Sequence, residues 1–420
     1  MKPLPLPPEI ETDINEIVDV AVSDVLKRLQ IAKHPVIWGG EGLQRFGLQE
    51  QFSKLVSLTS LPYTTTLLGK SLISEKELKE HFIGVYDSKF APESVKKVVE
   101  GSDCLLALGT ILSDFYGAIV GQSFEKMILA AGGAIRIGHY LYPNIPLDRF
   151  MNRLIEVLEQ KMYLEQTYTP PFGFDQIREL RAAHWSNTAD KRVKMSAASI
   201  LAESRNQPIT WDLFFEQMHH FINQDMVLLV DTSLCLFPSA ELPIEQRSHY
   251  MAQTAWLSIG FMVGAAVGAS MAIPENERVV VLTGDGGFQM IAQAFSTLAR
   301  YQKPAIMFVF DNQIYGIEQY LVDQSYYQNQ QSSPTFFNEL ARWDYVKLAE
   351  AFGGKGLLVK TMQELEQALI AAQEQKDKPI LISVRLDSRD LPSEIRATIN
   401  AAMSGLTEIS GNKIAPIGFN

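Results

Sequence analysis

A strand–helix–strand segment with polar residues at both strand ends constrains the fold of this chain most. It reads VVVLTGDGGFQMIAQAFSTLARYQKPAIMFVFDNQIYGIEQ, and Asp285 and Asn312 each follow closely on an apolar β run. In a parallel α/β sheet, two strand ends joined by one right-handed crossover can meet at the same edge. A carboxylate and an amide oxygen held there suit Mg²⁺, which keeps open positions for phosphate oxygens. The glycines beside Asp285 let the backbone approach those phosphates, and the following helix offers its N-terminus.

The same alternation of strands and helices fills two long stretches and predicts an α/β protein with two doubly wound parallel-sheet domains. In the first stretch we expect a helix over 13–31 and strands over 34–40, 61–67, 103–110 and 134–139. In the second we expect a helix over WDLFFEQMHHFI and strands over 226–231, 278–284, 305–310, 355–360 and 380–386. The predicted division is a Rossmann-like domain over 1–160, a linker over 161–207, a second domain over 208–390 and a tail over 391–420.

Composition narrows the function classes. The 420 residues carry a net charge of −11 and no basic stripe, which argues against nucleic-acid binding. Two cysteines exclude a disulfide framework and fit a reducing compartment. The opening MKPLPLPPEIETD lacks the apolar core of a signal peptide, and we see no membrane-spanning stretch. We therefore expect a soluble, cytoplasmic protein.

The motif GDG at one strand end, Asn at the next and IYGIE after it resembles that of thiamine-diphosphate-dependent 2-oxo acid decarboxylases, the pyruvate and indolepyruvate decarboxylase family. The resemblance covers nearly the whole chain. It implies that the first domain is the family's central domain and that the second binds thiamine diphosphate and Mg²⁺. Asp285 and Asn312 would ligate the metal through their side chains, and Ile314 through its carbonyl. Relatives usually have Gly where Ile314 stands, so this ligand requires a negative φ.

Two further blocks match the family's cofactor site. MAQTAWLSIG contains Ile259, which stands where a large aliphatic residue props the cofactor into a bent form, and Leu257, which replaces the usual Gly. DTSLCLFPSAELPI contains Thr232, whose hydroxyl would line the site. The resemblance also gives cofactor contacts to Gly284, Gly286, Gly287 and Tyr315, although relatives often carry Ser at position 287.

Glu318 is the predicted catalytic residue, because it aligns with the glutamate that these decarboxylases keep after their Asn. There it would handle protons at the substrate carboxylate and at the product-forming carbon. This favours decarboxylation of a pyruvate, phenylpyruvate or indolepyruvate type of substrate over carboligation of the acetolactate synthase kind, although both alternatives stay open.

Three other motifs receive plainer interpretations. His219-His220 lies on the predicted amphipathic helix rather than in the domain of the family's catalytic His pair. GGEGLQRFG follows a strand as a dinucleotide loop does, but it lacks G-x-G-x-x-G. Cys235 lacks a neighbouring base, so it is interpreted as a plain cysteine beside the cofactor or in the core rather than as a reactive thiol.

The resemblance begins at the family's central domain, so the pyrimidine-binding domain has no counterpart in the sequence. We expect a small partner chain to supply it, in a homo- or hetero-oligomer without which the chain is inactive. A truncated decarboxylase and a non-catalytic cofactor-binding or regulatory relative are the alternatives.

Overall fold

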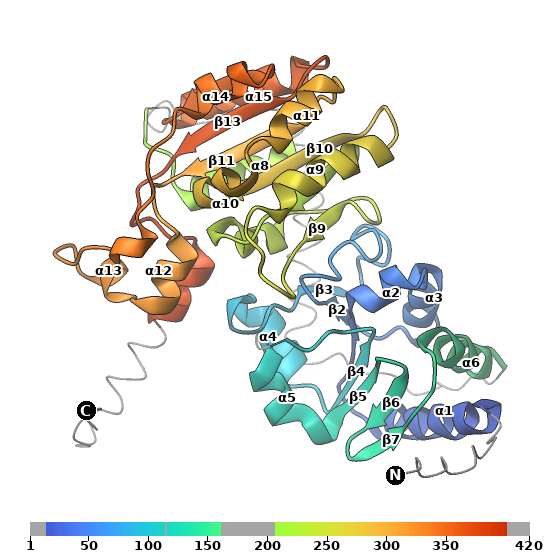
Figure 1. Cartoon of the computed structure of the whole chain (residues 1–420). Coiled ribbons are helices and arrows are strands. Elements are labelled where there is room, and N and C mark those ends of the chain that lie inside the picture. The colour runs from blue at the N-terminus through green and yellow to red at the C-terminus, as the bar shows by residue number, and fades with distance from the viewer. Residues whose placement is uncertain (1–13, 114–115, 161–205, 401–420) are drawn as a thin grey trace, which may run out of the picture.

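The computed structural model describes residues 14–113, 116–160 and 206–400, which form two α/β units around separate sheets (Figure 1). Both sheets are mostly parallel, as predicted. The predicted domain limits stay a prediction, because the expected linker and tail lie largely outside the described residues. Among the helices of the described ranges, none combines the length and the apolar composition that a membrane span requires.

The first sheet has seven strands in the order β3-β2-β1-β4-β5-β6-β7. They are β1 (Pro35–Gly39), β2 (Tyr63–Thr65), β3 (Phe82–Val85), β4 (Cys104–Leu108), β5 (Met127–Ala131), β6 (Ala134–Ile137) and β7 (Tyr140–Tyr142). The strands predicted over 34–40, 61–67 and 103–110 correspond to β1, β2 and β4, which are parallel. The strand predicted over 134–139 is β6, which is not parallel to its neighbours but forms antiparallel pairs with β5 and β7.

Helices cover both faces of this sheet. The cores that they share with the strands place α1 (Ile14–Ile31), α3 (Gln49–Thr59) and α6 (Leu147–Gln160) on one face, and α4 (Glu93–Glu100) and α5 (Gly117–Ser123) on the other. The predicted helix over 13–31 is α1, whose buried Val18, Val22, Val25 and Leu29 recur at helical spacing. A short helix, α2 (Glu41–Arg45), follows β1 directly.

The second sheet has six parallel strands in the order β12-β13-β11-β10-β8-β9. They are β8 (Met226–Val230), β9 (Tyr250–Ala252), β10 (Arg278–Gly284), β11 (Ile306–Asp311), β12 (Lys355–Val359) and β13 (Ile380–Arg385). All five predicted strands are present, and β9 is an additional short edge strand. Because every strand runs the same way, the loops after β8, β10 and β11 gather along one edge.

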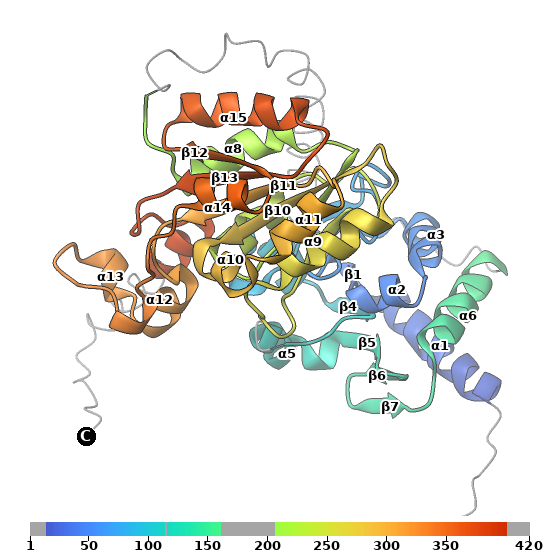
Figure 2. The same ribbon diagram turned by 45° about the horizontal axis from the view of Figure 1, so that its top comes forward.

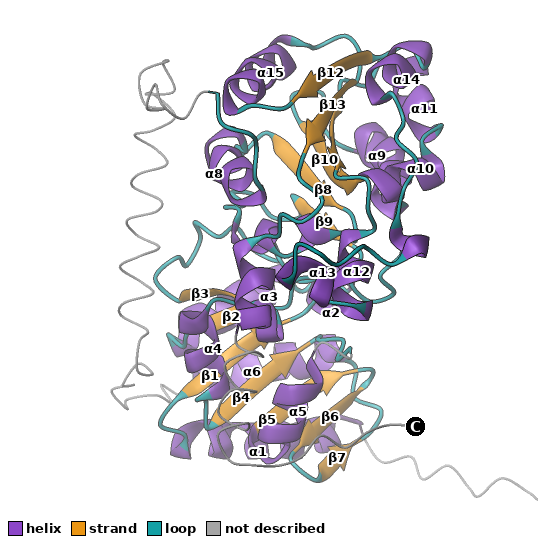
Figure 3. Cartoon of the chain, turned by 90° about the vertical axis from the view of Figure 1, so that its left-hand side faces the viewer, coloured by secondary structure: helices purple, strands orange, loops and turns teal. Residues whose placement is uncertain are grey.

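Two layers of helices enclose the second sheet (Figures 2 and 3). One layer has α8 (Trp211–Phe221), the predicted helix, and α15 (Met362–Glu374). The other has α9 (Phe261–Ala272), α10 (Asp285–Ile291), α11 (Ala294–Arg300) and α14 (Tyr345–Ala351). Two further helices, α12 (Gly316–Val322) and α13 (Ser325–Gln328), project to one side of the sheet (Figure 1).

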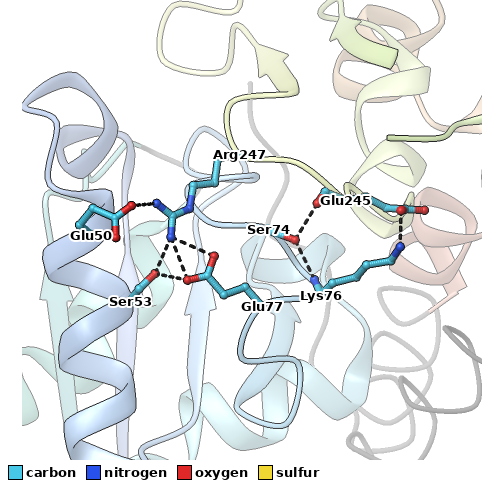
Figure 4. A network of polar contacts seen from close by, with 7 residues as sticks. All are labelled: Glu50, Ser53, Ser74, Lys76, Glu77, Glu245 and Arg247. Atoms are coloured by element: carbon cyan, nitrogen blue, oxygen red, sulfur yellow. Dashed lines mark hydrogen bonds and ion pairs between the residues drawn. The ribbon is translucent and has the colours of Figure 1, made fainter. Parts of the chain in front are cut away.

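A polar network joins the two units (Figure 4). Arg247, in the segment between β8 and β9, forms ion pairs with Glu50 and Glu77, the latter over 2.8 Å. Lys76 pairs with Glu245, and the Ser74 hydroxyl donates to the Glu245 carbonyl over 2.6 Å. The units are therefore held together by charged contacts on this side of their junction.

Candidate functional site

The ends of β10 and β11 lie side by side. Gly284 pairs with Phe310 in the parallel register, so Asp285 and Asn312 both follow at the same edge of the sheet. The backbone N–H of Gln313 donates to Asp285 Oδ2 over 2.7 Å, and that of Gly286 donates to Oδ1 over 2.9 Å. Asn312 is also buried, and its Oδ1 accepts from the Ile314 N–H over 3.4 Å.

Asp285 is a buried carboxyl group whose surroundings suit a cation. Its pKa is raised to about 7, chiefly by burial and to a smaller extent by the negative charge of Asp311, against the backbone hydrogen bonds from Gln313 and Gly286. Arg385 pairs with Asp311 over 2.8 Å. Oxygen ligands of this kind fit Mg²⁺, and a divalent cation beside Asp285 would stabilise its charged form. No cluster of three or more His, Cys, Asp or Glu side chains suited to a metal occurs in the described ranges, so amide and carbonyl oxygens would have to complete such a site.

One pocket of about 440 Å³, open at its mouth, collects the predicted residues. Ten of them line it: Thr232, Ile259, Gly284, Asp285, Gly286, Gly287, Asn312, Ile314, Tyr315 and Glu318. Leu257, two residues before Ile259, is not among the lining residues and is partly exposed.

Four aromatic and aliphatic residues that the sequence did not single out also line this pocket: Trp211, Leu234, Phe310 and Ile317. Trp211 begins α8, and its ring packs 4.5 Å from that of Phe310. Its indole Nε1 is buried and has no hydrogen-bond partner among the described residues. The only signal in the sequence was a tryptophan at the start of an amphipathic helix, which gave no reason to place it beside Asp285.

Close neighbours leave no room for a side chain at the two glycines that follow Asp285. A Cβ on Gly286 would lie 2.2 Å from Tyr315 Cε1, and a Cβ on Gly287 would lie 2.4 Å from Asp231 Oδ2. The space that a side chain would fill at position 287 is thus already occupied by a carboxylate. A side chain at position 287 would therefore have to displace that carboxylate.

Asp231 is a structural residue of the site that the sequence did not reveal. Its Oδ2 accepts from the Gly260 N–H and from the Thr283 hydroxyl, each over 2.8 Å, and its Oδ1 accepts from the Met262 N–H. Burial raises its pKa, while these hydrogen bonds oppose the shift. Asp231 therefore ties the end of β8 to β10 and to the start of α9, next to Ile259.

The backbone departs from ordinary geometry at two non-glycine positions near the pocket. Gln313 has φ 61° and Leu257 has φ 52°, both in the left-handed region. Ile314 does not have a positive φ, so its conformation meets the condition set for a carbonyl ligand. The Thr232 hydroxyl donates to the Gln253 carbonyl over 2.8 Å, which leaves only its lone pairs for another contact.

Glu318 stands in the first turn of α12 at the rim of the pocket and is exposed. Two hydrogen bonds connect α12 to the segment that follows it. The Tyr327 hydroxyl donates to the Gly316 carbonyl over 2.8 Å, and the buried Gln319 side chain accepts from the Thr335 N–H.

The two histidines and Cys235 lie outside this pocket. His219 and His220 occupy the last turn of α8 and do not line the pocket. Cys235 is fully buried, and burial raises the pKa of its thiol far above the ordinary value.

Comparison with known proteins identifies both α/β units. Residues 22–140 match the model of the thiamine pyrophosphate enzyme central domain, and residues 235–384 match that of the C-terminal TPP binding domain. The chain is 26% identical over 412 residues to pyruvate decarboxylase of Candida glabrata, covering 94% of this chain and 66% of that protein. It is 25% identical to pyruvate decarboxylase isozyme 3 of Saccharomyces cerevisiae, over 95% of this chain and 65% of the relative. Pyruvate decarboxylase of Aspergillus fumigatus is 27% identical, over 92% and 63%.

The chain thus spans about two thirds of the length of the curated relatives it matches. The fold and the family expected from the sequence are confirmed. The predicted cofactors, thiamine diphosphate and Mg²⁺, are those of these enzymes. The chain belongs to the thiamine pyrophosphate enzymes and carries their central domain and their C-terminal cofactor-binding domain.

Proposed function

We propose that this chain holds the magnesium-diphosphate end of thiamine diphosphate in a 2-oxo acid decarboxylase of the pyruvate, phenylpyruvate or indolepyruvate type. One observation carries the proposal: Asp285 and Asn312 end neighbouring parallel strands and open on a pocket that also contains Ile259 and Glu318. Asp285, Asn312 and the Ile314 carbonyl would ligate Mg²⁺. Gly286 and Gly287 line the same pocket at the start of α10, and the N-terminal end of a helix favours phosphate groups.

Ile259 and Glu318 have separate roles in this proposal. Ile259 would support the bent form of the cofactor, since it lines the pocket just before the left-handed Gly260 that begins α9. The bound cofactor supplies the electron sink that allows CO₂ to leave a 2-oxo acid. Glu318 would deliver the proton that replaces CO₂ at the carbonyl carbon, so that the 2-oxo acid and one proton yield an aldehyde and CO₂.

Exposed apolar side chains support a second part of the proposal, that polypeptide outside these 420 residues completes the site. Trp256 is 83% exposed and Met290 58% exposed, on segments that flank Ile259 and follow Gly287. Leu321 and Val322, 60% and 56% exposed, follow Glu318 on α12. We propose that a small chain carrying a pyrimidine-binding domain covers this apolar rim, excludes water from Glu318 and contacts the pyrimidine end of the cofactor.

Both cysteines are free and buried, which fits a cytoplasmic enzyme.

Calorimetric titration of the chain with thiamine diphosphate and Mg²⁺ tests the proposal. We expect magnesium-dependent binding that Asp285→Asn and Asn312→Ala each weaken at least about tenfold, as loss of metal-site groups does. Asp377→Asn, in an exposed loop of the same unit, is the matched control. Undiminished binding by Asp285→Asn would refute the metal assignment. Turnover of pyruvate by the 420 residues alone would refute the need for outside polypeptide.

A further inference from the structure

After β11 the chain leaves the second sheet and returns to it at α14. The segment in between, residues 313–340, brings Ile314, Tyr315 and Glu318 to the pocket. It contains α12 and α13, which project to one side of the sheet (Figure 1). Glu318 stands in the first turn of α12 and is exposed. Its place at the pocket therefore depends on the contacts that hold this segment.

The side chain of Gln319, which is fully buried, joins the two halves of the 313–340 segment. Its Oε1 accepts from the Thr335 N–H over 2.8 Å and from the Asn338 side-chain amide over 3.1 Å. The Asn338 carbonyl in turn accepts from the Tyr315 N–H over 2.9 Å. Because Gln319 directly follows Glu318, these hydrogen bonds set the shape of the segment around the start of α12.

Arg389, shortly after β13, connects the same segment to the sheet. Its guanidinium lies 4.0 Å from the centroid of the Tyr326 ring. It also donates hydrogen bonds to main-chain carbonyls, those of Tyr326, Asn329, Gln330 and Ser332. The planar, five-donor guanidinium group suits bonding to several acceptors at once, and a lysine ammonium cannot reproduce this arrangement.

Further hydrogen bonds link this anchored loop to the first turn of α12. The Tyr326 and Ser388 hydroxyls are 2.7 Å apart, which fixes the ring that the guanidinium covers. The next residue, Tyr327, donates its hydroxyl to the Gly316 carbonyl over 2.8 Å. Because α12 begins at Gly316, a short series of contacts runs from the guanidinium to the turn that carries Glu318.

We propose that Arg389 is a positioning residue that holds α12 so that Glu318 lies at the pocket. The inference rests on the function proposed above, in which Glu318 transfers a proton. Arg389 does not line the pocket, so it acts through α12 rather than on the cofactor or the substrate. Since a displacement of about 1 Å can lower a rate about 10²-fold, loss of this anchor has a measurable effect on catalysis.

Hydrogen–deuterium exchange of the whole chain, without cofactor, tests the anchoring. In Arg389→Ala we expect the backbone amides of 316–322 and 325–332 to exchange at least about tenfold faster, since local opening becomes easier. Exchange in β10 and β11 should stay unchanged. Arg389→Lys, which keeps the charge without the planar group, should give an intermediate increase. Arg300→Ala is the matched control, because it removes an exposed arginine 5.8 Å from the Tyr301 ring in the same unit.

A double-mutant cycle in the enzyme completed by the proposed pyrimidine-binding chain separates positioning from general damage. Arg389→Ala should lower kcat for a 2-oxo acid about 10- to 100-fold. Its affinity for thiamine diphosphate should stay within about threefold of that of wild type. Arg389→Ala combined with Glu318→Gln should be no slower than Glu318→Gln alone, whereas independent losses would multiply. Tyr327→Phe, which removes the hydroxyl that reaches Gly316, should show the same pattern.

Wild-type exchange of α12 in Arg389→Ala would overturn the proposal, and so would losses of kcat that multiply in the double variant. A fall in cofactor affinity equal to the fall in kcat would also overturn it, because the whole site would then be disturbed. The exchange measurement needs neither cofactor nor turnover, so its result is separate from the function proposed for Asp285. A completed enzyme without turnover would refute that function and leave the exchange result to decide the anchoring.

Discussion

The backbone N–H of Gln313 donates to the Asp285 carboxylate over 2.7 Å, which fixes the end of β11 to the end of β10. Gln313 reaches this position with a left-handed φ of 61°. The predicted metal site therefore depends on the backbone of a residue whose side chain has no role in it.

Gln313→Pro tests this dependence. Proline removes the donating N–H and restricts φ to about −65°, so we expect magnesium-dependent binding of thiamine diphosphate to weaken at least about tenfold. Gln313→Gly, which keeps the N–H and adopts positive φ without strain, should bind within about threefold of wild type. Equal affinities of the two variants in calorimetric titration would show that this hydrogen bond does not position Asp285.

Glu318→Gln should separate cofactor binding from chemistry. The residue stands at the rim of the pocket, so thiamine diphosphate affinity should stay unchanged. In the enzyme completed by the proposed pyrimidine-binding chain, kcat for a 2-oxo acid should fall by about 10²- to 10⁴-fold, as expected for loss of a proton-transfer group. Glu350→Gln, on the exposed face of α14, is the control. An unchanged kcat would remove Glu318 from the mechanism.

Gly287→Ser, which introduces the residue common in relatives, should destabilise this chain. Its Cβ would lie 2.4 Å from Asp231 Oδ2, so the Asp231 hydrogen bonds must shift. We expect the free energy of unfolding to fall by about 1–3 kcal/mol in urea titration, as overpacking does. Gly268→Ala, where a Cβ meets nothing within 4 Å, should be neutral or stabilising. Wild-type stability for Gly287→Ser would show that Asp231 is free to move.

Stability should fall as pH rises from weakly acidic to neutral. Asp87 is buried after β3, and burial raises its pKa from 3.8 to about 7. Between about pH 4 and pH 7 the unfolded chain has lost this proton and the folded chain keeps it, so ionisation favours unfolding. The decline in stability ends above about pH 7, where Asp87 is ionised in both the folded and the unfolded chain.

Urea unfolding in buffers across this pH range, without metal, measures the effect. Asp87→Asn should reduce the decline in stability with pH. Part should remain, because Asp285, whose pKa is also raised to about 7, acts in the same direction. Asp225→Asn, at an exposed position, should leave the decline intact. A pH profile unaffected by Asp87→Asn would show that Asp87 is ionised in the folded protein.

Arg247→Ala should weaken the coupling between the unfolding of the two units, while it lowers the overall free energy of unfolding only slightly. Arg247 is partly buried and contacts Glu50, Ser53 and Glu77 of the other unit (Figure 4). We expect calorimetry to resolve two unfolding transitions in place of closely coupled ones, with a loss of about 1 kcal/mol or less from the exposed pairs. Arg153→Ala breaks ion pairs with Asp19 and Glu156 inside one unit and should leave the coupling unchanged.

The sequence predicted the part of the fold that long apolar runs determine. The runs before Gly284 and Asn312 became β10 and β11, and their shared edge follows from parallel register alone. The hairpin of β5 and β6 was missed, although Gly132-Gly133 between two apolar runs is a typical tight-turn signal and both glycines have positive φ. The short strands β3 and β9 gave no periodicity to detect, with four and three residues.

The rest of the candidate site could not be predicted, because it depends on contacts between distant segments. Trp211 reaches the pocket from α8, and Asp231 binds Gly260, 29 positions away. Neither contact leaves a local pattern in the sequence. The exposure of Glu318 could not be predicted from the sequence either, since it depends on which segments cover α12.

Leu257 shows that a non-glycine residue can adopt the backbone conformation that a turn of this site requires. Its φ of 52° is the conformation that glycine adopts most easily, and the matching position in the family is usually Gly. A leucine there carries a penalty of roughly 1–2 kcal/mol and still follows the left-handed path. The turn before Ile259 thus follows a left-handed backbone path that glycine favours, although the residue at that point is a leucine.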